Sequence, residues 1–134
     1  MRAILDANVL VSALISRIGS PARLIEEWLS GALEIILCPA LLEEIERTLS
    51  APKLSGRIDP ADATRFLAIL RGSSVIVADP SDPPPVQSVD PGDDYLIVLA
   101  ARERLPIVSG DRHLLTLSEQ IPVFSPSDFL AQLV

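Results

Sequence analysis

The sequence predicts an α/β fold, in which α-helices flank a mostly parallel β-sheet. Short segments rich in Ile, Leu and Val alternate with longer segments of helical periodicity, as in proteins with a parallel sheet. Hydrophobic residues make up 49% of the chain and aromatic residues only 4%, so the core is expected to be aliphatic. A length of 134 residues is typical of one domain, and we expect residues 1–134 to form a single domain.

The predicted strands are short apolar segments. They span residues 2–5, 34–38, 74–78, 106–108 and 122–124. The apolar stretch that follows Asn8 and ends at Ile15 is expected to lie in the hydrophobic core, and no helix is predicted there.

The helices are predicted from capping residues and apolar spacing. The first begins at Ser20, the expected N-cap, followed by Pro21, and stops at Gly31. The others span residues 39–50, 60–72, 114–117 and 127–133. A further helix is expected to be capped by Asp93 or Asp94, with an interior from Tyr95 to Ala101 that is apolar on all sides. Residues 79–91 hold five of the 12 prolines and are expected to form a stiff connection.

Composition limits the class of protein. The net charge of −7 argues against a protein that mainly binds nucleic-acid phosphates, although every one of the 11 basic residues except Lys53 is Arg. The single cysteine, Cys38, excludes an internal disulfide and a site of several thiolates. No apolar run approaches the roughly 20 residues of a membrane span, and Asp6 comes too early for a signal peptide. We therefore expect a soluble, cytoplasmic protein without a membrane partner.

Three aspartates fall near one edge of the predicted sheet. Asp6 directly follows the first strand, and Asp111 follows the strand at 106–108. The carboxyl ends of parallel strands meet at one edge, where ligands bind in open sheets. Asp94 begins an apolar helix that leads into the strand before Asp111.

Helical spacing adds a glutamate from the helix at 39–50. Its apolar stripe consists of Leu41, Leu42, Ile45 and Leu49. Glu44 and Glu46 lie on the two rims of this stripe, whereas Glu43 lies opposite it. The pattern favours Glu44 or Glu46 over Glu43 and does not choose between them.

Each acid also has a simpler explanation. Asp94 or Asp93 would serve as a helix N-cap, Asp111 as a turn residue, and Glu44 as a solvated helix residue. Taken together, however, two carboxylates at ~4 Å repel by about 4 kcal/mol at an effective dielectric near 20. We expect the acids to bind a cation, and all-oxygen ligands favour Mg²⁺ or Mn²⁺. Without the cation, their repulsion should raise the pKa of at least one of them.

Four segments of the chain resemble the PIN domain, and within it the small bacterial toxins related to VapC. They are "ILDANVLVSAL", "CPALLEEIERTLSAPKL", "DPGDDYLIVLAARERLPIVSGDRHLL" and "IPVFSPSDFL", in the family's order and over almost the entire chain. The resemblance implies a Mg²⁺- or Mn²⁺-dependent endoribonuclease that cleaves single-stranded RNA. It also implies a cognate antitoxin as partner and assembly into a homodimer or higher homo-oligomer.

The resemblance assigns roles to individual residues. The catalytic and metal-binding acids are Asp6, Glu44, Asp94 and Asp111, which selects Glu44 over Glu46. Asn8 and Ser109 match supporting polar positions. Family members often have a further acid soon after the position of Asp111, where this chain has Arg112 and His113. Asp93 or Asp90 is a hypothetical substitute.

Binding of RNA would require a local basic patch, since the net charge is negative. Arg17, Arg23, Lys53 and Arg57 are candidates, because they lie in segments that could surround the site.

Two other functions are considered. "ILDANVL" also resembles the first motif of haloacid-dehalogenase-type phosphatases, in which Asp6 would be the nucleophile. That motif requires a second acid where this chain has Asn8. The other alternative is a non-catalytic PIN-like module that binds RNA or protein, although such a module has no need of all four acids.

Overall fold

The computed structural model describes residues 1–54, 56–81 and 94–133, and it confirms the α/β fold. A five-stranded sheet has the order β3-β2-β1-β4-β5, and every neighbouring pair is parallel. The strands are β1 (Arg2–Leu5), β2 (Glu34–Leu37), β3 (Val75–Ile76), β4 (Ile107–Val108) and β5 (Val123–Phe124).

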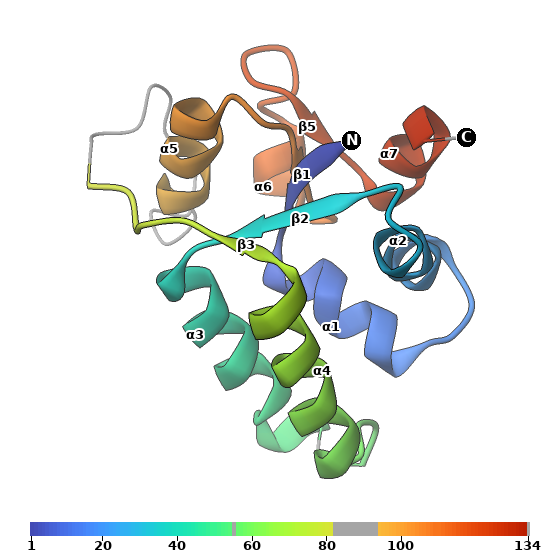
Figure 1. The fold of residues 1–134 in the computed structure, drawn as a ribbon. Helices are drawn as coiled ribbons and strands as arrows, with labels where there is room; N and C mark the ends of the chain where they lie inside the picture. The colour runs from blue at the N-terminus through green and yellow to red at the C-terminus, as the bar shows by residue number, and fades with distance from the viewer. Residues whose placement is uncertain (55, 82–93, 134) are drawn as a thin grey trace.

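Helices flank this sheet. They are α1 (Ala7–Ile15), α2 (Ser20–Leu29), α3 (Pro39–Leu49), α4 (Pro60–Ser73), α5 (Asp94–Glu103), α6 (Arg112–Leu115) and α7 (Pro126–Leu133), with a short 3₁₀ helix at Pro52–Leu54. In the view of Figure 1, α3 and α4 lie below β2 and β3, and α5 lies above them. Helix α1 packs against α2 and α3, and α2 also packs against α7.

The strand order reverses at β1, and this reversal positions the candidate site. From β1 the chain adds β2 and β3 on one side, and later β4 and β5 on the other. Residues Ile4 and Leu5 of β1 pair with Ile107 and Val108 of β4, so the residues that follow both strands leave the sheet side by side. In open α/β sheets, ligands bind at such a switch point, beyond the carboxyl ends of the strands.

The core is aliphatic, as predicted. All four residues 35–38 of the second predicted strand are buried, including Cys38, and Trp28 is buried as well. In α5, five consecutive residues from Leu96 to Ala100 are buried, which confirms that this helix is apolar on all sides. No helix in the described ranges is long and apolar enough to cross a membrane.

Helix α1 was not predicted, and the reason is physical. Ala7, Val9, Leu10 and Val11 are all buried, so the polar side of the first turns is narrow and consists of Asn8 and Ser12. Val is also a poor helix former. The signal that would have revealed α1 is its N-cap: the side chain of Asp6 accepts a hydrogen bond from the backbone N–H of Asn8.

Several predicted boundaries were wrong by a few residues. Gly19, not Ser20, is the N-cap of α2, and it makes no side-chain capping bond. Strand β3 ends at Ile76, and beyond it the guanidinium of Arg102 binds the carbonyl oxygens of Ala78 and Asp79. The short helix predicted at 114–117 lies at Arg112–Leu115. Most of the proline-rich connection at 79–91 lies outside the described residues.

Candidate active site

Asp6 lies at the carboxyl end of β1 with only 4% of its surface exposed. Both carboxylate oxygens accept hydrogen bonds. Oδ1 accepts the backbone N–H of Asn8 at 3.3 Å, which caps α1, and Oδ2 accepts the hydroxyl of Ser109 at 2.7 Å. The backbone N–H of Asp6 also donates to the carbonyl of Val108 at 3.0 Å. Asp6 is therefore held by both strands of the switch point.

Ser109 joins the two aspartates that follow β1 and β4. It is fully buried, donates to Asp6 and accepts the backbone N–H of Asp111 at 3.0 Å. Asp111 is half-buried and is the N-cap of α6, where its Oδ1 accepts the backbone N–H of His113 at 2.8 Å. Asp6 and Asp111 each cap a helix and also lie at the edge of the sheet where ligands bind. The capping role proposed as a simpler explanation therefore does not exclude a role in the site. His113 is exposed and lies beside Asp111.

Glu44 extends the site from α3. It is half-buried, and its carboxylate accepts a hydrogen bond from the hydroxyl of Tyr95 in α5. Glu46 instead faces α4 and pairs with Arg71 at 3.3 Å, whereas Glu43 is exposed. The choice between Glu44 and Glu46, which the helical pattern left open, therefore depends on contacts with other helices.

The charges of these acids act on one another. Burial is the main cause that raises the pKa of Asp6, and the carboxylates of Glu44 and Asp111 raise it further. The hydrogen bonds from Ser109 and Asn8 oppose this rise. The sequence predicted a raised carboxyl pKa from repulsion alone, but removal from water contributes more than the neighbouring charges do.

Asp94 is the first residue of α5 and is half-buried. It directly precedes Tyr95, whose hydroxyl contacts Glu44, so the start of α5 lies next to the acid from α3. Asp93 and Asp90, the proposed supporting acids, lie outside the residues that the structure describes.

The oxygen ligands of this site fit Mg²⁺ or Mn²⁺, but the described residues alone do not form a complete set of metal ligands. Within ranges 1–54, 56–81 and 94–133, no three carboxylate, imidazole or thiol groups are arranged to hold a metal ion. The expectation of three or four gathered acids is not met in that form. Mg²⁺ usually takes only one or two carboxylates from a protein and keeps several water ligands. Asp6 with Glu44 or Asp111 provides such a set.

A hollow lies next to these acids. Its lining includes Asn8 and Ser12 of α1, together with Gly110 and Asp111. Asn8 and Ser12 are one turn apart and both exposed, so their side chains are available to a bound molecule. The hollow therefore connects a candidate metal ligand to neutral hydrogen-bonding groups.

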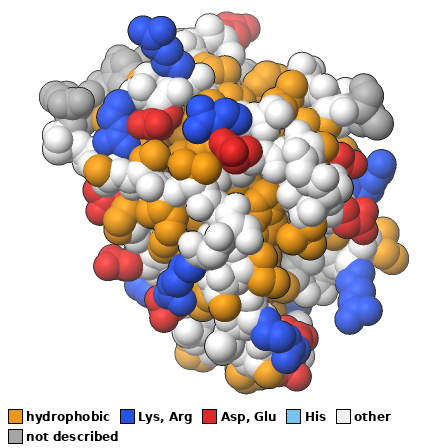
Figure 2. All heavy atoms as spheres, in the orientation of Figure 1, with side chains coloured by type: hydrophobic (Ala, Val, Ile, Leu, Met, Phe, Trp, Pro, Cys, Tyr) orange, Lys and Arg blue, Asp and Glu red, His pale blue; other side chains and the backbone are white. Residues whose placement is uncertain are grey.

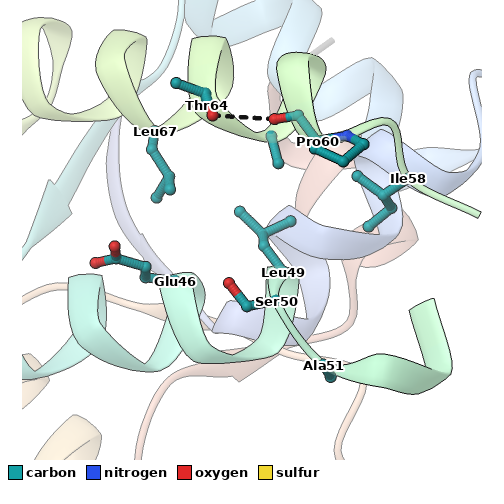
Figure 3. Close-up of a pocket in the computed structure, with 9 residues that line it drawn as sticks. Glu46, Leu49, Ser50, Ala51, Ile58, Pro60, Thr64 and Leu67 are labelled. Carbon is teal, nitrogen blue, oxygen red and sulfur yellow. Dashed lines mark hydrogen bonds between the residues drawn. The ribbon is translucent and has the colours of Figure 1, made fainter. Parts of the chain in front are cut away.

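The pocket in Figure 3 is a different feature. It lies between α3 and α4, where Leu49 and Leu67 point toward each other, and Glu46 lies at one end. The hydroxyl of Thr64 donates to the carbonyl of Pro60 at its edge. None of the four predicted acids is among the residues that line this pocket, so it is separate from the site at the sheet edge.

Two of the four candidate RNA-binding residues share a groove. Arg17 and Arg57 line a common groove with residues of α1 and α4, but Arg23 and Lys53 do not. All four are exposed, and none forms an ion pair with another described residue. On the face shown in Figure 2, basic side chains occur as separate spots among acidic and apolar ones.

Comparison with known families decides the identity of the fold. A family model described as "PIN domain" matches residues 2–113, which include every predicted acid. This chain belongs to the PIN-domain family. PIN domains are generally metal-dependent nucleases, which agrees with the carboxylates at the sheet edge. The haloacid-dehalogenase alternative is not supported by this match.

Solved structures agree with this assignment at the level of the fold. PAE2754 from Pyrobaculum aerophilum has a TM-score of 0.66 and 21% identity, over 99% of this chain and 89% of that one. FitAcB from Neisseria gonorrhoeae has a TM-score of 0.56 and 12% identity, over 95% of this chain and 99% of that one. No curated protein sequence matches the chain significantly.

Tyr95 is the contact that sequence reasoning missed. It appeared only as part of an apolar helix, and nothing local distinguishes it from a core residue. The available signal was a single polar hydroxyl next to Asp94 in an otherwise aliphatic segment. Its partner Glu44 lies 51 residues away, so the pairing depends on how α3 and α5 pack.

Proposed function

We propose that this PIN domain is an endoribonuclease that requires Mg²⁺ or Mn²⁺ and cleaves single-stranded RNA. The observation that carries the proposal is the group of interacting acids at the switch point, with Asp6 buried between β1 and β4 and affected by both Glu44 and Asp111. A buried carboxylate is costly unless it is hydrogen-bonded, paired or bound to a cation. Asp6 keeps lone pairs for a cation because each of its oxygens accepts only one hydrogen bond from the described residues.

We assign the residues of the site as follows. Asp6, Glu44, Asp94 and Asp111 line the cation site, where one or two of the carboxylates bind the cation directly and the others act through its water ligands. Asp93 is a supporting acid. A cation bound there supplies Lewis-acid activation of water and stabilisation of charge at the phosphate. Ser109 orients Asp6 and Asp111 through its two hydrogen bonds. Asn8 contacts the RNA from the adjacent hollow.

The test is cleavage of a labelled single-stranded RNA by the purified chain with Mn²⁺, with Mg²⁺ and with EDTA. Asp111→Asn, purified in the same way, controls for contaminating ribonucleases. Cleavage by the wild type with metal, absent in EDTA and in the variant, is the expected result. Equal cleavage by both proteins, or full activity in EDTA, would overturn the proposal. RNA binding without cleavage would favour the non-catalytic alternative.

We further propose that the protein is the toxin of a toxin–antitoxin pair in the cytoplasm, on the basis of its resemblance to VapC-related proteins. Its partners would then be a cognate antitoxin and further copies of itself. Light scattering coupled to size-exclusion chromatography should show a mass of at least a dimer. Expression in bacteria should arrest growth, and co-expression of the product of the adjacent gene should relieve the arrest. Normal growth of expressing cells would contradict the toxin assignment.

A further inference from the structure

The hydrogen bond between Tyr95 and Glu44 connects the first turn of α5 to the middle of α3. The phenol hydroxyl donates to Oε2 of Glu44, and no other described residue donates to that carboxylate. We propose that Tyr95 is a positioning residue, which holds the Glu44 carboxylate toward Asp6 in the orientation that binds the divalent cation. This inference rests on the proposed metal-dependent function and assigns to it a residue outside the acidic set.

The ring of Tyr95 is suited to this role because it is itself held in place. It is half-buried and packs against the hydrophobic core, while its hydroxyl reaches toward α3. A phenol is protonated at neutral pH, so the hydroxyl is available as a donor to the Glu44 carboxylate. A rigid donor on one helix thus fixes a flexible acceptor on another.

Glu44 needs such a partner more than Asp6 does. A glutamate side chain has three rotatable bonds and loses their freedom when it binds an ion. Asp6 is buried and fixed by Ser109 and Asn8, whereas Glu44 is half-exposed and depends on one hydrogen bond. Tyr95 orders this carboxylate before the cation arrives, which removes part of the cost of ordering from the binding step.

The hydrogen bond also leaves room for the cation. It occupies one lone pair of Oε2, while Oε1 accepts no hydrogen bond from the described part of the chain. A partner that orients a metal ligand in this way typically changes metal affinity or activity by 10–100-fold when it is removed.

The experiment compares the full wild-type chain with Tyr95→Phe, which removes the hydroxyl and keeps the ring. Free Mn²⁺ is measured by electron paramagnetic resonance without RNA, and cleavage is measured over a range of Mn²⁺ concentrations. We expect Tyr95→Phe to weaken Mn²⁺ binding by about tenfold or more. Cleavage should require correspondingly more Mn²⁺, approach the wild-type maximal rate at high Mn²⁺, and show an unchanged KM for RNA.

Thr48→Val is the matched control. Thr48 lies on the same helix, and its hydroxyl donates to the backbone carbonyl of Glu44 at 2.8 Å and not to the carboxylate. Loss of this hydroxyl should leave Mn²⁺ affinity unchanged. Thermal melts of all variants in EDTA check that each one is folded.

A double-mutant cycle tests whether Tyr95 acts through Glu44. In a Glu44→Gln background, Tyr95→Phe should cause no further loss of Mn²⁺ affinity. Equal losses in both backgrounds, or wild-type affinity in Tyr95→Phe, would overturn the inference. Wild-type protein that binds no Mn²⁺ would overturn it together with the proposed function. Wild-type protein that binds Mn²⁺ in a Tyr95-dependent way but does not cut RNA would overturn only the proposed nuclease function.

Discussion

Ser109 donates a hydrogen bond to Oδ2 of Asp6 at 2.7 Å, although 103 residues separate the two in the chain. The contact exists because β1 and β4 are neighbours in parallel register, and each of these residues directly follows its strand. Both residues are buried, so water does not compete for the bond. The orientation of Asp6 is thus set by the strand order and by one hydroxyl group.

Replacement of Ser109 by Ala should destabilise the protein at neutral pH. Hydrogen bonds to charged groups are worth about 1.5–3 kcal/mol, and the loss leaves one oxygen of buried Asp6 without a donor among the described residues. The free energy of unfolding, measured with urea, should fall by about 2 kcal/mol.

Ser74→Ala is the matched control for this measurement. The Ser74 hydroxyl is buried and has no hydrogen-bond partner in the described ranges, so its removal should be neutral or stabilising. If the two variants lose the same stability, the Ser109–Asp6 bond contributes nothing specific.

The raised pKa of Asp6 predicts how stability depends on pH in the absence of metal. The folded state holds a proton on Asp6 at pH values where the unfolded chain has released it. The contribution of Asp6 to stability is therefore complete below the unfolded pKa and is lost as pH rises through the folded pKa.

Asp6→Asn removes this titration, while Asn still serves as an N-cap. In EDTA the variant should be at least as stable as wild type at pH 7, because a pKa that is higher by one in the folded state than in the unfolded state costs about 1.4 kcal/mol. The difference should disappear toward pH 4. Urea unfolding of both proteins from pH 4 to pH 8 measures it. A variant that is less stable throughout would show that the hydrogen bonds of Asp6 outweigh its burial.

The fold was largely predictable because the strands are short aliphatic segments at the expected positions. The two aspartates at the sheet edge were predictable for the same reason, since Asp6 and Asp111 directly follow strand residues. Helix α1 was missed because it is buried on most sides, and the narrow polar stripe of Asn8 and Ser12 gives only a weak helical periodicity.

The rest of the site depends on tertiary contacts. Glu44 and Glu46 lie on equivalent rims of α3, and only the positions of Tyr95 and Arg71 distinguish them. The largest influence on the pKa of Asp6 is likewise burial, which follows from the whole fold and not from the spacing of acids.

Glu44→Gln should reduce cleavage of RNA severely, while Glu43→Gln should be nearly silent. Glu44 is half-buried beside Tyr95, whereas Glu43 is exposed on the same helix. Loss of one electrostatic group in an active site commonly costs about 100-fold or more in kcat. Initial rates at saturating RNA would measure both effects. Equal losses would show that Glu44 has no special role.

Binding of RNA should weaken steeply as salt increases, despite the net charge of −7. For single strands, the slope of log affinity against log salt is roughly −0.7 for each phosphate neutralised. Arg17→Gln and Arg57→Gln should each reduce this slope, because the two side chains line one groove. Arg47→Gln is a control, since Arg47 is exposed on α3 and does not line that groove. Fluorescence anisotropy with the inactive Asp111→Asn protein gives the slopes, and identical slopes would exclude Arg17 and Arg57 from the interface.

Addition of metal should stabilise wild type and reverse its order of stability relative to Asp6→Asn. A ligand that binds only the folded state stabilises it by about 2.7 kcal/mol when its concentration is 100 times its Kd. Wild type gains this stabilisation because the cation offsets the charge of buried Asp6, which in EDTA is unfavourable at pH 7. Asp6→Asn lacks the charge, so it gains little.

Thermal melts of both proteins, in EDTA and in millimolar Mn²⁺, decide this prediction. The variant should melt at or above wild type in EDTA and below it in Mn²⁺. Ca²⁺ at the same concentration should raise the melting temperature of wild type less than Mn²⁺ does. Ca²⁺ prefers 6–8 oxygen ligands, and one or two carboxylates do not supply that many. Equal shifts of both proteins with Mn²⁺ would mean that the ion binds elsewhere. The role of Asp6 would then be limited to capping α1 and accepting the hydrogen bond from Ser109. The proposed metal site would lose its central ligand.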